Sequence, residues 1–187
     1  MAAKPFWSGV FPAITTQLRR DQSLDLEATG RHLEVLIDSG VSGMIVLGSL
    51  GENQSLSPEE KRLVLARAVE VADGRVPVLS GVAETSCAAA AAYVRDGEKL
   101  GADGFMVMPA MCYRGDAEET LAHFRTVAAA TALPLMAYNN PLSYANDLTP
   151  ELFLRLGEIK NYVALKESSG DVRRITDLHN LVGDRFA

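Results

Sequence analysis

Lys166 is the residue of this sequence best placed for covalent chemistry. It ends the apolar run Val163-Ala164-Leu165 and precedes Glu167. Burial disfavours a charged ammonium group, so a lysine at the end of a buried strand becomes a nucleophile towards carbonyl carbons. An ion pair with Glu167 or another carboxylate is the structural alternative. Spacing alone leaves both interpretations open.

Two further positions carry groups that would assist such a nucleophile. Tyr138 ends the preceding apolar run, where a phenol would pass protons to or from a carbinolamine oxygen during imine formation. A tyrosine packed at the rim is the alternative. Gly48 and Gly51 enclose Ser49 and Leu50, and such a turn can offer backbone N–H groups to a carboxylate. A plain tight turn explains the same spacing.

The remaining polar residues predict no second chemistry. The three histidines, His32, His123 and His179, fall within helical patterns and are predicted to be structural. The run from Ser168 to Asp171 is predicted to cap a helix that begins near Val172. No spacing suggests a Ser/His/Asp triad or a metal site, so no cofactor is expected.

The elements that position these residues recur at a period of about thirty residues, typical of βαβ units. Helical patterns lie between the apolar runs. One begins with the capping box Ser57-Pro58-Glu59-Glu60, and another begins with Asp116 and Glu119. Further helical patterns span 26–37 and 88–100 and begin at Thr149. The runs are continuously apolar, as in a parallel sheet covered on both faces. They span 9–14, 43–47, 76–80, 104–108, 133–138 and 162–166.

This alternation predicts an α/β fold, either a doubly wound sheet or a (β/α)8 TIM barrel. No GxGxxG turn follows the first run, which favours the barrel. A closed barrel typically needs about 250 residues. We therefore expect 1–187 to be one barrel domain, truncated after about six β/α units, with strands seven and eight missing. The outermost predicted strands would then be unpaired edges.

Composition narrows the class of protein. The formal net charge is −6 and no large basic cluster occurs, which argues against a nucleic-acid partner. No apolar run approaches the roughly 20 residues of a membrane span, so no membrane is expected. The start lacks the features of a signal peptide, and Cys87 and Cys112 do not form a disulfide framework. These features together predict a cytoplasmic protein.

The motifs together resemble the dihydrodipicolinate synthase / N-acetylneuraminate lyase family. The resemblance rests on three segments: Gly48-Ser49-Leu50-Gly51-Glu52, Tyr138-Asn139-Asn140-Pro141 and Val163-Ala164-Leu165-Lys166-Glu167-Ser168-Ser169-Gly170. The resemblance implies a (β/α)8 barrel in which Lys166 forms an imine with a 2-oxo acid and Tyr138 relays protons. It also implies that the loop around Ser49 and Leu50 grips the substrate carboxylate. Family members are commonly tetramers, so a homo-oligomer is expected.

Departures from the family pattern bear on the substrate. Dihydrodipicolinate synthases carry a tyrosine pair where this chain has Ala110 and Met111, and an arginine where it has Ser143. Leu50 replaces a second hydroxyl residue. The chain resembles most a subgroup, the 1-pyrroline-4-hydroxy-2-carboxylate deaminases, which implies release of ammonia and 2-oxoglutarate semialdehyde in hydroxyproline breakdown. A dihydrodipicolinate synthase, a 2-keto-3-deoxy sugar acid aldolase or dehydratase, and a catalytically silent binding paralogue are the alternatives.

Overall fold

The computed structural model describes residues 7–187, which form one parallel sheet with helices between its strands. The first six residues, on which the signal-peptide expectation rests, lie outside the described part. The strand order β1-β2-β3-β4-β5 follows the chain. The strands are β1 (Met44–Val46), β2 (Val78–Val82), β3 (Gly104–Val107), β4 (Leu135–Asn139) and β5 (Tyr162–Glu167).

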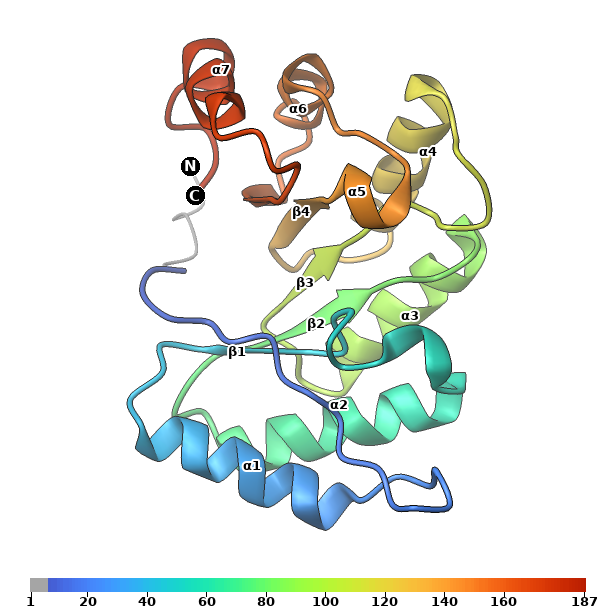
Figure 1. The fold of residues 1–187 in the computed structure, drawn as a ribbon, viewed down its shortest axis with the longest axis vertical. Helices are drawn as coiled ribbons and strands as arrows, with labels where there is room; N and C mark the ends of the chain where they lie inside the picture. The colour runs from blue at the N-terminus through green and yellow to red at the C-terminus, as the bar shows by residue number, and fades with distance from the viewer. Residues whose placement is uncertain (1–6) are drawn as a thin grey trace.

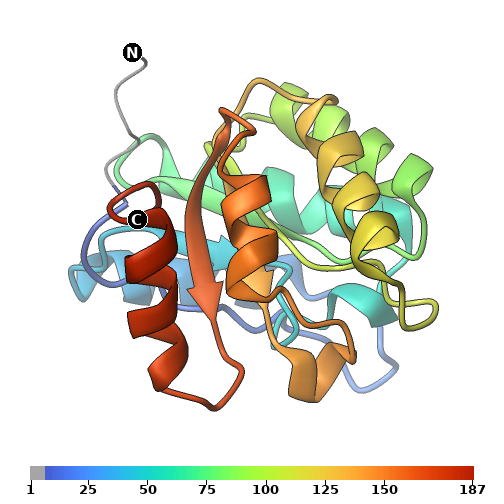
Figure 2. The ribbon, with the colours of Figure 1, turned by 90° about the horizontal axis from the view of Figure 1, so that it is seen from above.

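The helices form an arc around one face of this sheet (Figure 1). In the second view, α6 and α7 flank β5 (Figure 2). No helix in the described part is long and apolar enough to cross a membrane. The helices are α1 (Leu26–Asp38), α2 (Pro58–Ala72), α3 (Cys87–Lys99), α4 (Ala117–Ala128), α5 (Pro141–Tyr144), α6 (Pro150–Leu156) and α7 (Arg173–Val182), with the 3-10 turn η1 (Asn53–Ser55).

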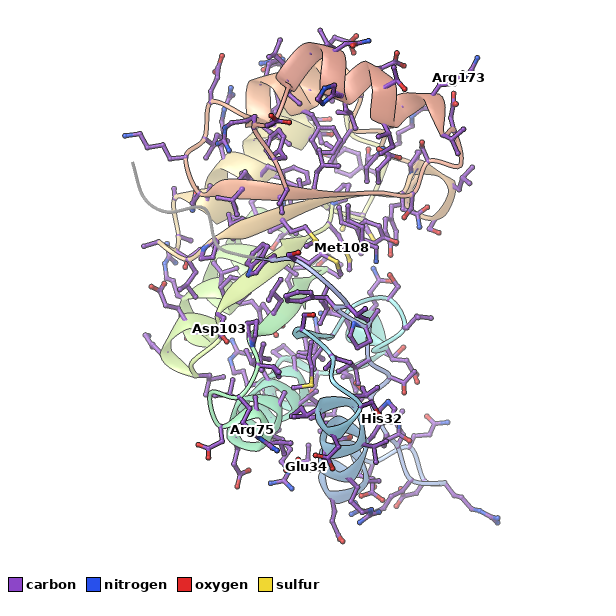
Figure 3. The ribbon with its side chains drawn as sticks, turned by 90° about the vertical axis from the view of Figure 1, so that its left-hand side faces the viewer. His32, Glu34, Arg75, Asp103, Met108 and Arg173 are labelled. Atoms are coloured by element: carbon purple, nitrogen blue, oxygen red, sulfur yellow. The ribbon has the colours of Figure 1, made fainter. Side chains whose placement is uncertain are left out.

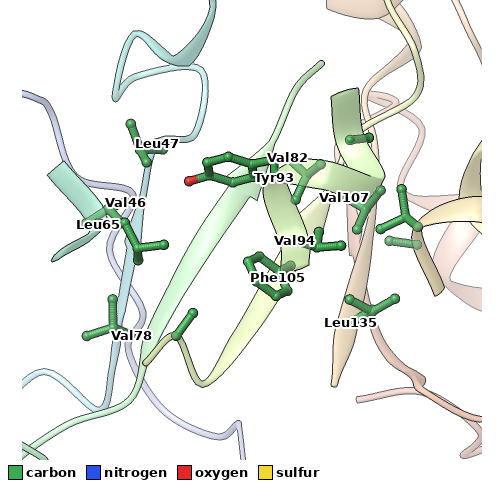
Figure 4. Close-up of a cluster of buried hydrophobic side chains, with 14 of the residues drawn as sticks. Val46, Leu47, Leu65, Val78, Val82, Tyr93, Val94, Phe105, Val107 and Leu135 are labelled. Atoms are coloured by element: carbon green, nitrogen blue, oxygen red, sulfur yellow. The ribbon is translucent and has the colours of Figure 1, made fainter. Parts of the chain in front are cut away.

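The main core lies between the sheet and these helices. Alternate strand residues such as Val46, Phe105 and Leu135 are fully buried there against helix residues such as Leu65 and Val94 (Figure 4). Burial of this kind stabilises by roughly 25 cal/mol for each Å² of apolar surface removed from water. Because alternate residues of a strand face opposite sides, the residues buried in this core determine which side chains face away from the helices.

The opposite face of the sheet carries a second, smaller apolar cluster. Its buried part consists of Ile45, Leu79, Ala83, Met106, Met108 and Tyr138. Met136 of β4 packs against it, as do side chains from the segment before α1 and from the β3–α4 and α5 regions: Trp7, Phe11, Met111 and Tyr144. In a barrel this is the inner face, and residues at the carboxyl ends of its strands line the mouth.

An irregularity in the β4–β5 pairing turns Lys166 onto this inner face. Leu135 pairs with Tyr162, but the next residue of β4 pairs with Ala164, so β5 contains one extra residue. A bulge of this kind reverses which side chains face each way beyond it. Tyr162 therefore belongs to the helix-side core. Lys166 instead pairs with Tyr138 of the inner cluster.

The first predicted strand, 9–14, is wrong as a full strand. Only Ala13 makes a ladder contact, with Ile45 of β1 in parallel. Two features explain this, because Gly9 has a positive φ of 96° and Pro12 has no backbone N–H to donate. The segment still lies where the first strand was expected, since Ile14 N donates to the Ile45 carbonyl at 2.9 Å.

The capping predictions had mixed outcomes. Ser57 and Asp116 both form complete capping boxes, as predicted. At α7 the N-cap residue is Val172, which makes no side-chain cap, but the predicted run from Ser168 to Asp171 does serve the start of the helix, of which Arg173 is the first residue. Asp171 accepts hydrogen bonds from the backbone N–H of Arg173 and from its guanidinium group.

The outer edge of β5, predicted to be unpaired, is partly paired. Ala187 N donates to the Val163 carbonyl at 2.9 Å, and Leu165 N donates to the Ala187 carbonyl at 3.1 Å. The backbone of β5 around the bulge is therefore hydrogen-bonded on both sides. This pairing limits slippage of the register that orients Lys166.

Gly81 gives a test of how closely β1 and β2 approach at the mouth. A Cβ atom there would lie 2.1 Å from the Leu47 carbonyl oxygen. We expect Gly81→Ala to lower the free energy of unfolding by about 1–3 kcal/mol, because the backbone must move to accept it. Urea denaturation measures this change. The matched control is Gly115→Ala, where the nearest atom, Glu119 Cβ, is 3.5 Å away; equal stability of the two variants would contradict the prediction.

Candidate active site

Lys166 lies on the inner face with no carboxylate partner. Its Nζ is 4.2 Å from the centroid of the Tyr138 ring. Among the described residues it takes part in no ion pair, whereas the buried Lys61 is bonded to Glu84 at 2.7 Å. An open cavity of about 370 Å³ borders Lys166, and the side chains of Ile45 and Met136 line it as well. A small ligand can therefore approach the amine from the inner face.

The predicted alternative, an ion pair between Lys166 and Glu167, is wrong. Neighbouring residues of a strand face opposite sides, so the two side chains diverge. Glu167 instead accepts hydrogen bonds from Asn139 Nδ2 at 3.0 Å and from Ser169 N at 2.5 Å. Its negative charge is used to hold the ends of β4 and β5 together.

Tyr138 lies beside the amine with its hydroxyl held in place. Its side chain is buried, and Asn140 Nδ2 donates to its hydroxyl oxygen at 3.1 Å. Because the amide uses the oxygen as acceptor, the phenol proton stays free to be donated elsewhere. The ring also packs edge-to-face against Tyr144, with centroids 5.7 Å apart. The structure thus places the predicted amine and the predicted phenol together.

The loop after β1 presents two backbone N–H groups. Gly51 N and Asn53 N donate to the Gly48 carbonyl, which closes the turn. Within the described part, the N–H groups of Ser49 and Leu50 donate to no other group. Both residues are exposed at the mouth. Gly48 and Gly51 therefore form a tight turn, as the plain-turn alternative states. The N–H groups of Ser49 and Leu50 remain available to bind an anion.

Close packing keeps this loop in one conformation. A Cβ at Gly51 would lie 2.8 Å from Leu47 N and 2.9 Å from the Ile14 carbonyl oxygen, so only glycine fits. Leu47 adopts a left-handed conformation with φ 56°, which costs energy for a residue with a side chain. Asn53 Nδ2 stabilises it by donating to the Leu47 carbonyl at 3.0 Å and to that of Gly81 at 3.2 Å. Sequence reasoning missed Asn53, although it directly follows the glycine motif.

Tyr144 is the residue that joins the loop to the lysine, and sequence reasoning missed it too. It ends α5, and its hydroxyl is hydrogen-bonded to Ser49 Oγ while its ring contacts Tyr138. Burial raises the pKa of Tyr144, the bond from Ser49 lowers it, and the nearby Tyr138 hydroxyl raises it further. The sequence feature that could have indicated it is a second tyrosine six positions after Tyr138, in the segment that follows the same strand.

Asn139 is a buried polar residue that fixes the whole loop after β4. Its Nδ2 donates to Asp147 at 3.1 Å and to Glu167 at 3.0 Å, and its Oδ1 accepts from Leu148 N at 2.9 Å. Arg174 completes the cluster with two hydrogen bonds to Asp147. Burial alone would raise the pKa of Asp147, but the hydrogen bonds from Arg174 and Asn139 outweigh it and hold this pKa below its usual value.

The histidines take no part in this site. His32 lies on α1, away from Met108 at the centre of the molecule (Figure 3). His123 is buried, its Nε2 is 3.1 Å from the Met108 carbonyl, and burial lowers its pKa. His179 is exposed on α7. Cys87 and Cys112 are free thiols. Residues 7–187 contain no cluster of three or more metal-ligating side chains.

Comparison with known proteins decides the family. Residues 6–187 match the dihydrodipicolinate synthetase family over almost the whole chain. The chain belongs to this family. Its fold is accordingly that of a (β/α)8 barrel, as the sequence predicted, and the described strands form a contiguous part of that barrel.

Named relatives place it within this family. A 4-hydroxy-tetrahydrodipicolinate synthase from Salinibacter ruber is 35% identical over 179 residues, which cover 95% of this chain and 59% of that protein. YagE, a prophage protein from E. coli K12 solved in complex with pyruvate, superposes with a TM-score of 0.91 at 30% identity, over 95% of this chain and 60% of that one. A chloride-inhibited dihydrodipicolinate synthase from Acinetobacter baumannii, complexed with pyruvate, gives 0.92 at 30% identity, over 96% and 62%. This chain therefore spans about 60% of the length of these family members.

The divergent positions also lie near the mouth. Met111 borders a pocket of about 150 Å³ together with Ser49 and Tyr144. Its Sδ accepts a hydrogen bond from Gln54 at 3.0 Å. Ser143 is exposed on α5, and its backbone N donates to Asn140 Oδ1 at 3.1 Å. Neither position supplies a cation to a second carboxylate.

Removing the Asn139 side chain tests its role as the organiser of the loop. We expect Asn139→Ala to lower the free energy of unfolding by about 1–3 kcal/mol, because the buried Leu148 N–H loses its acceptor. Chemical denaturation measures the loss. Asn180→Ala, on the exposed side of α7, is the matched control and should change stability by less than about 0.5 kcal/mol. Equal effects in the two variants would show that Asn139 does not organise the loop.

Proposed function

We propose that this protein is a Schiff-base-forming lyase that acts on a 2-oxo acid or a cyclic imino acid. The observation that carries the proposal is the position of Lys166, an unpaired amine over the Tyr138 ring beside an open inner-face cavity. Family membership supports it independently. The one buried lysine in the described part, Lys61, is held by Glu84 and is unavailable as a nucleophile.

Imine formation assigns a role to each group. Lys166 Nζ attacks C2 of the substrate, and the electron pair of the C2=O bond moves to oxygen. Tyr138 gives its phenol proton to that oxygen. The nitrogen then loses a proton, the oxygen gains a second one, and water leaves as the C2–O bond breaks. The resulting imine accepts electrons from the neighbouring carbon, which is the step that lyases of this kind exploit.

The substrate carboxylate binds at the loop after β1 in this proposal. The free N–H groups of Ser49 and Leu50 belong to an anion-binding turn at the mouth. Gly48 and Gly51 determine the shape of this turn. Leu50 contributes only its backbone, because its side chain cannot form hydrogen bonds. Two related structures are described as pyruvate complexes, which supports a 2-oxo acid as the minimal ligand.

We further propose 1-pyrroline-4-hydroxy-2-carboxylate as the substrate, in a hydroxyproline breakdown route. Lys166 would attack its C2, the enamine would expel the 4-hydroxyl group, and hydrolysis would release ammonia and 2-oxoglutarate semialdehyde. The neutral residues Ala110, Met111 and Ser143 favour this over a substrate with a second carboxylate, which needs a cation. The family pattern also implies a homo-oligomer, which we include in the proposal.

Three alternatives to this substrate and activity remain. The relatives named 4-hydroxy-tetrahydrodipicolinate synthase favour the synthase reaction, which condenses pyruvate with an aldehyde. Sugar-acid aldolase or dehydratase activity uses the same lysine. Met111 and Leu50 are the positions that favour a catalytically silent binding paralogue, whereas Lys166 and Tyr138 argue against it.

Borohydride trapping tests the central proposal. With pyruvate and borohydride, we expect mass analysis to find a reduced adduct on Lys166 of the purified protein. Lys166→Ala should abolish it, because among the described residues no other lysine lines the inner-face cavity. Lys160→Ala is the matched control, since Lys160 is exposed just before β5, and it should label as fully as the unaltered protein. An adduct on another lysine, or none, would remove the proposed function.

Turnover tests the substrate. The purified protein should release ammonia and 2-oxoglutarate semialdehyde from 1-pyrroline-4-hydroxy-2-carboxylate, measured with a coupled dehydrogenase. Tyr138→Phe should slow this by about 10²–10⁴-fold, because the ring stays while the transferable proton is lost. Faster turnover of pyruvate with an aldehyde, or of a 2-keto-3-deoxy sugar acid, would replace the pyrroline with that substrate. Labelling of Lys166 without turnover of any of them would indicate the silent paralogue.

A further inference from the structure

Three hydroxyl groups from separate segments form a row at the mouth. Ser49 follows β1, Tyr144 ends α5 and Tyr138 lies in β4. The hydroxyls of Ser49 and Tyr144 are hydrogen-bonded, and the Tyr138 hydroxyl is near enough to that of Tyr144 to raise its pKa, after the larger effect of burial. The two rings hold this order through an edge-to-face contact with centroids 5.7 Å apart.

Exposure increases along the row. Tyr138 is 7% exposed, Tyr144 is half-buried, and Ser49 is exposed beside the pocket of about 150 Å³. The inner end of the row touches the Lys166 amine through the Tyr138 ring. Hydroxyl groups both donate and accept protons, so such a row can carry a proton from solvent to a buried phenol.

The other neighbours of Tyr138 cannot serve as its proton source. Asn140 donates an amide N–H to its hydroxyl, and an amide does not release that proton under ordinary conditions. Met111, on the same pocket as Tyr144, carries a thioether and accepts from Gln54. Ala110 has no polar side chain. Within the described part, Tyr144 is the one side chain that gives Tyr138 a route to Ser49.

We propose that Tyr144 is a positioning residue that returns protons from Ser49 to Tyr138, so that the relay lies within a single copy of the chain. The inference rests on the proposed function, because it needs Tyr138 to protonate the carbinolamine oxygen. When Tyr138 gives its proton to that oxygen, Tyr144 gives its own to the Tyr138 phenolate. Ser49 then reprotonates Tyr144 and takes a proton from water, which balances the proton released as the nitrogen becomes an imine.

The test uses Tyr144→Phe, which keeps the ring and removes the hydroxyl. We expect the maximal rate of the pyruvate adduct on Lys166 to fall by about 10- to 100-fold, with the half-saturating pyruvate concentration unchanged. Tyr144 does not touch the substrate in this scheme, so binding should not weaken. The matched control is Tyr113→Phe, an exposed tyrosine bonded to Glu119, which should react at the unaltered rate.

Ser49→Ala breaks the same contact from the other side. It should slow adduct formation, and the Ser49→Ala/Tyr144→Phe double variant should be no slower than the slower single variant, because one relay is broken twice. This second series also decides the question if Tyr144→Phe does not fold. Additive losses would overturn the proposal, since the two residues would then act independently.

Co-production of two variants tests whether the relay lies in one chain. Tyr144→Phe retains Lys166, and Lys166→Ala retains Tyr144. If the relay is internal, mixed assemblies should react no faster than Tyr144→Phe alone. Recovery of the unaltered rate per Lys166 would overturn the proposal, because Tyr144 would then act on a neighbouring copy.

The outcomes separate this inference from the proposed function. An unaltered protein that forms no adduct overturns the proposed function, and the relay with it. An adduct on Lys166 that forms equally fast in Tyr144→Phe overturns the relay alone. A rise only in the half-saturating pyruvate concentration would also overturn it, because Tyr144 would then be a binding residue.

Discussion

The register between β4 and β5 is the constraint on which the rest of the site depends. One extra residue in β5 places Tyr162 in the helix-side core and Lys166 on the inner face, opposite Tyr138. With regular alternation from Tyr162, Lys166 would point towards α6 and α7, where a charged amine would be buried among apolar side chains. The bulge allows one short strand to contribute both to the core and to the site.

Polar side chains then hold the loops at the mouth. Asn53 fixes the loop after β1 by binding two carbonyl groups, and Asn139 fixes the loop after β4 by binding Asp147, Glu167 and Leu148. Each asparagine is almost fully buried and satisfies backbone groups that the sheet leaves unpaired. Two buried amides therefore fix the loops that carry the N–H groups and the hydroxyl row.

The sequence predicted most of the fold, because its signals are local. Continuous apolar runs and capping residues mark β1 to β5 and the starts of α2 and α4 directly. Lys166 and Tyr138 could be placed together since both end adjacent strands. The first strand was overestimated, because apolar character does not reveal the lost N–H of Pro12 or the turn at Gly9. The start of α7 was predicted only approximately: the N-cap position is Val172, and the capping contact comes from Asp171 one residue earlier, which binds the N–H of Arg173.

The parts that the sequence did not reveal depend on contacts between distant segments. Tyr144 and Ser49 are 95 positions apart, and no local pattern connects them. Asn139 stands inside a quoted motif, yet its role depends on Asp147 and on Glu167 from the next strand. A bulge has no composition of its own in β5, so the inward direction of Lys166 was reached from its position at the strand end rather than from alternation.

The placement of Tyr144 on α5 has a consequence for how such a protein can change. The nucleophile belongs to the sheet, but the second tyrosine belongs to a four-residue helix between Asn140 and a left-handed Ala145. Asn139 and Arg174 clamp the chain just beyond it, through Leu148 and Asp147. The segment from 140 to 147 therefore behaves as an exchangeable module, bounded by fixed anchor points. Substitutions inside it can alter the reactivity of the barrel while the strands and their register stay as they are.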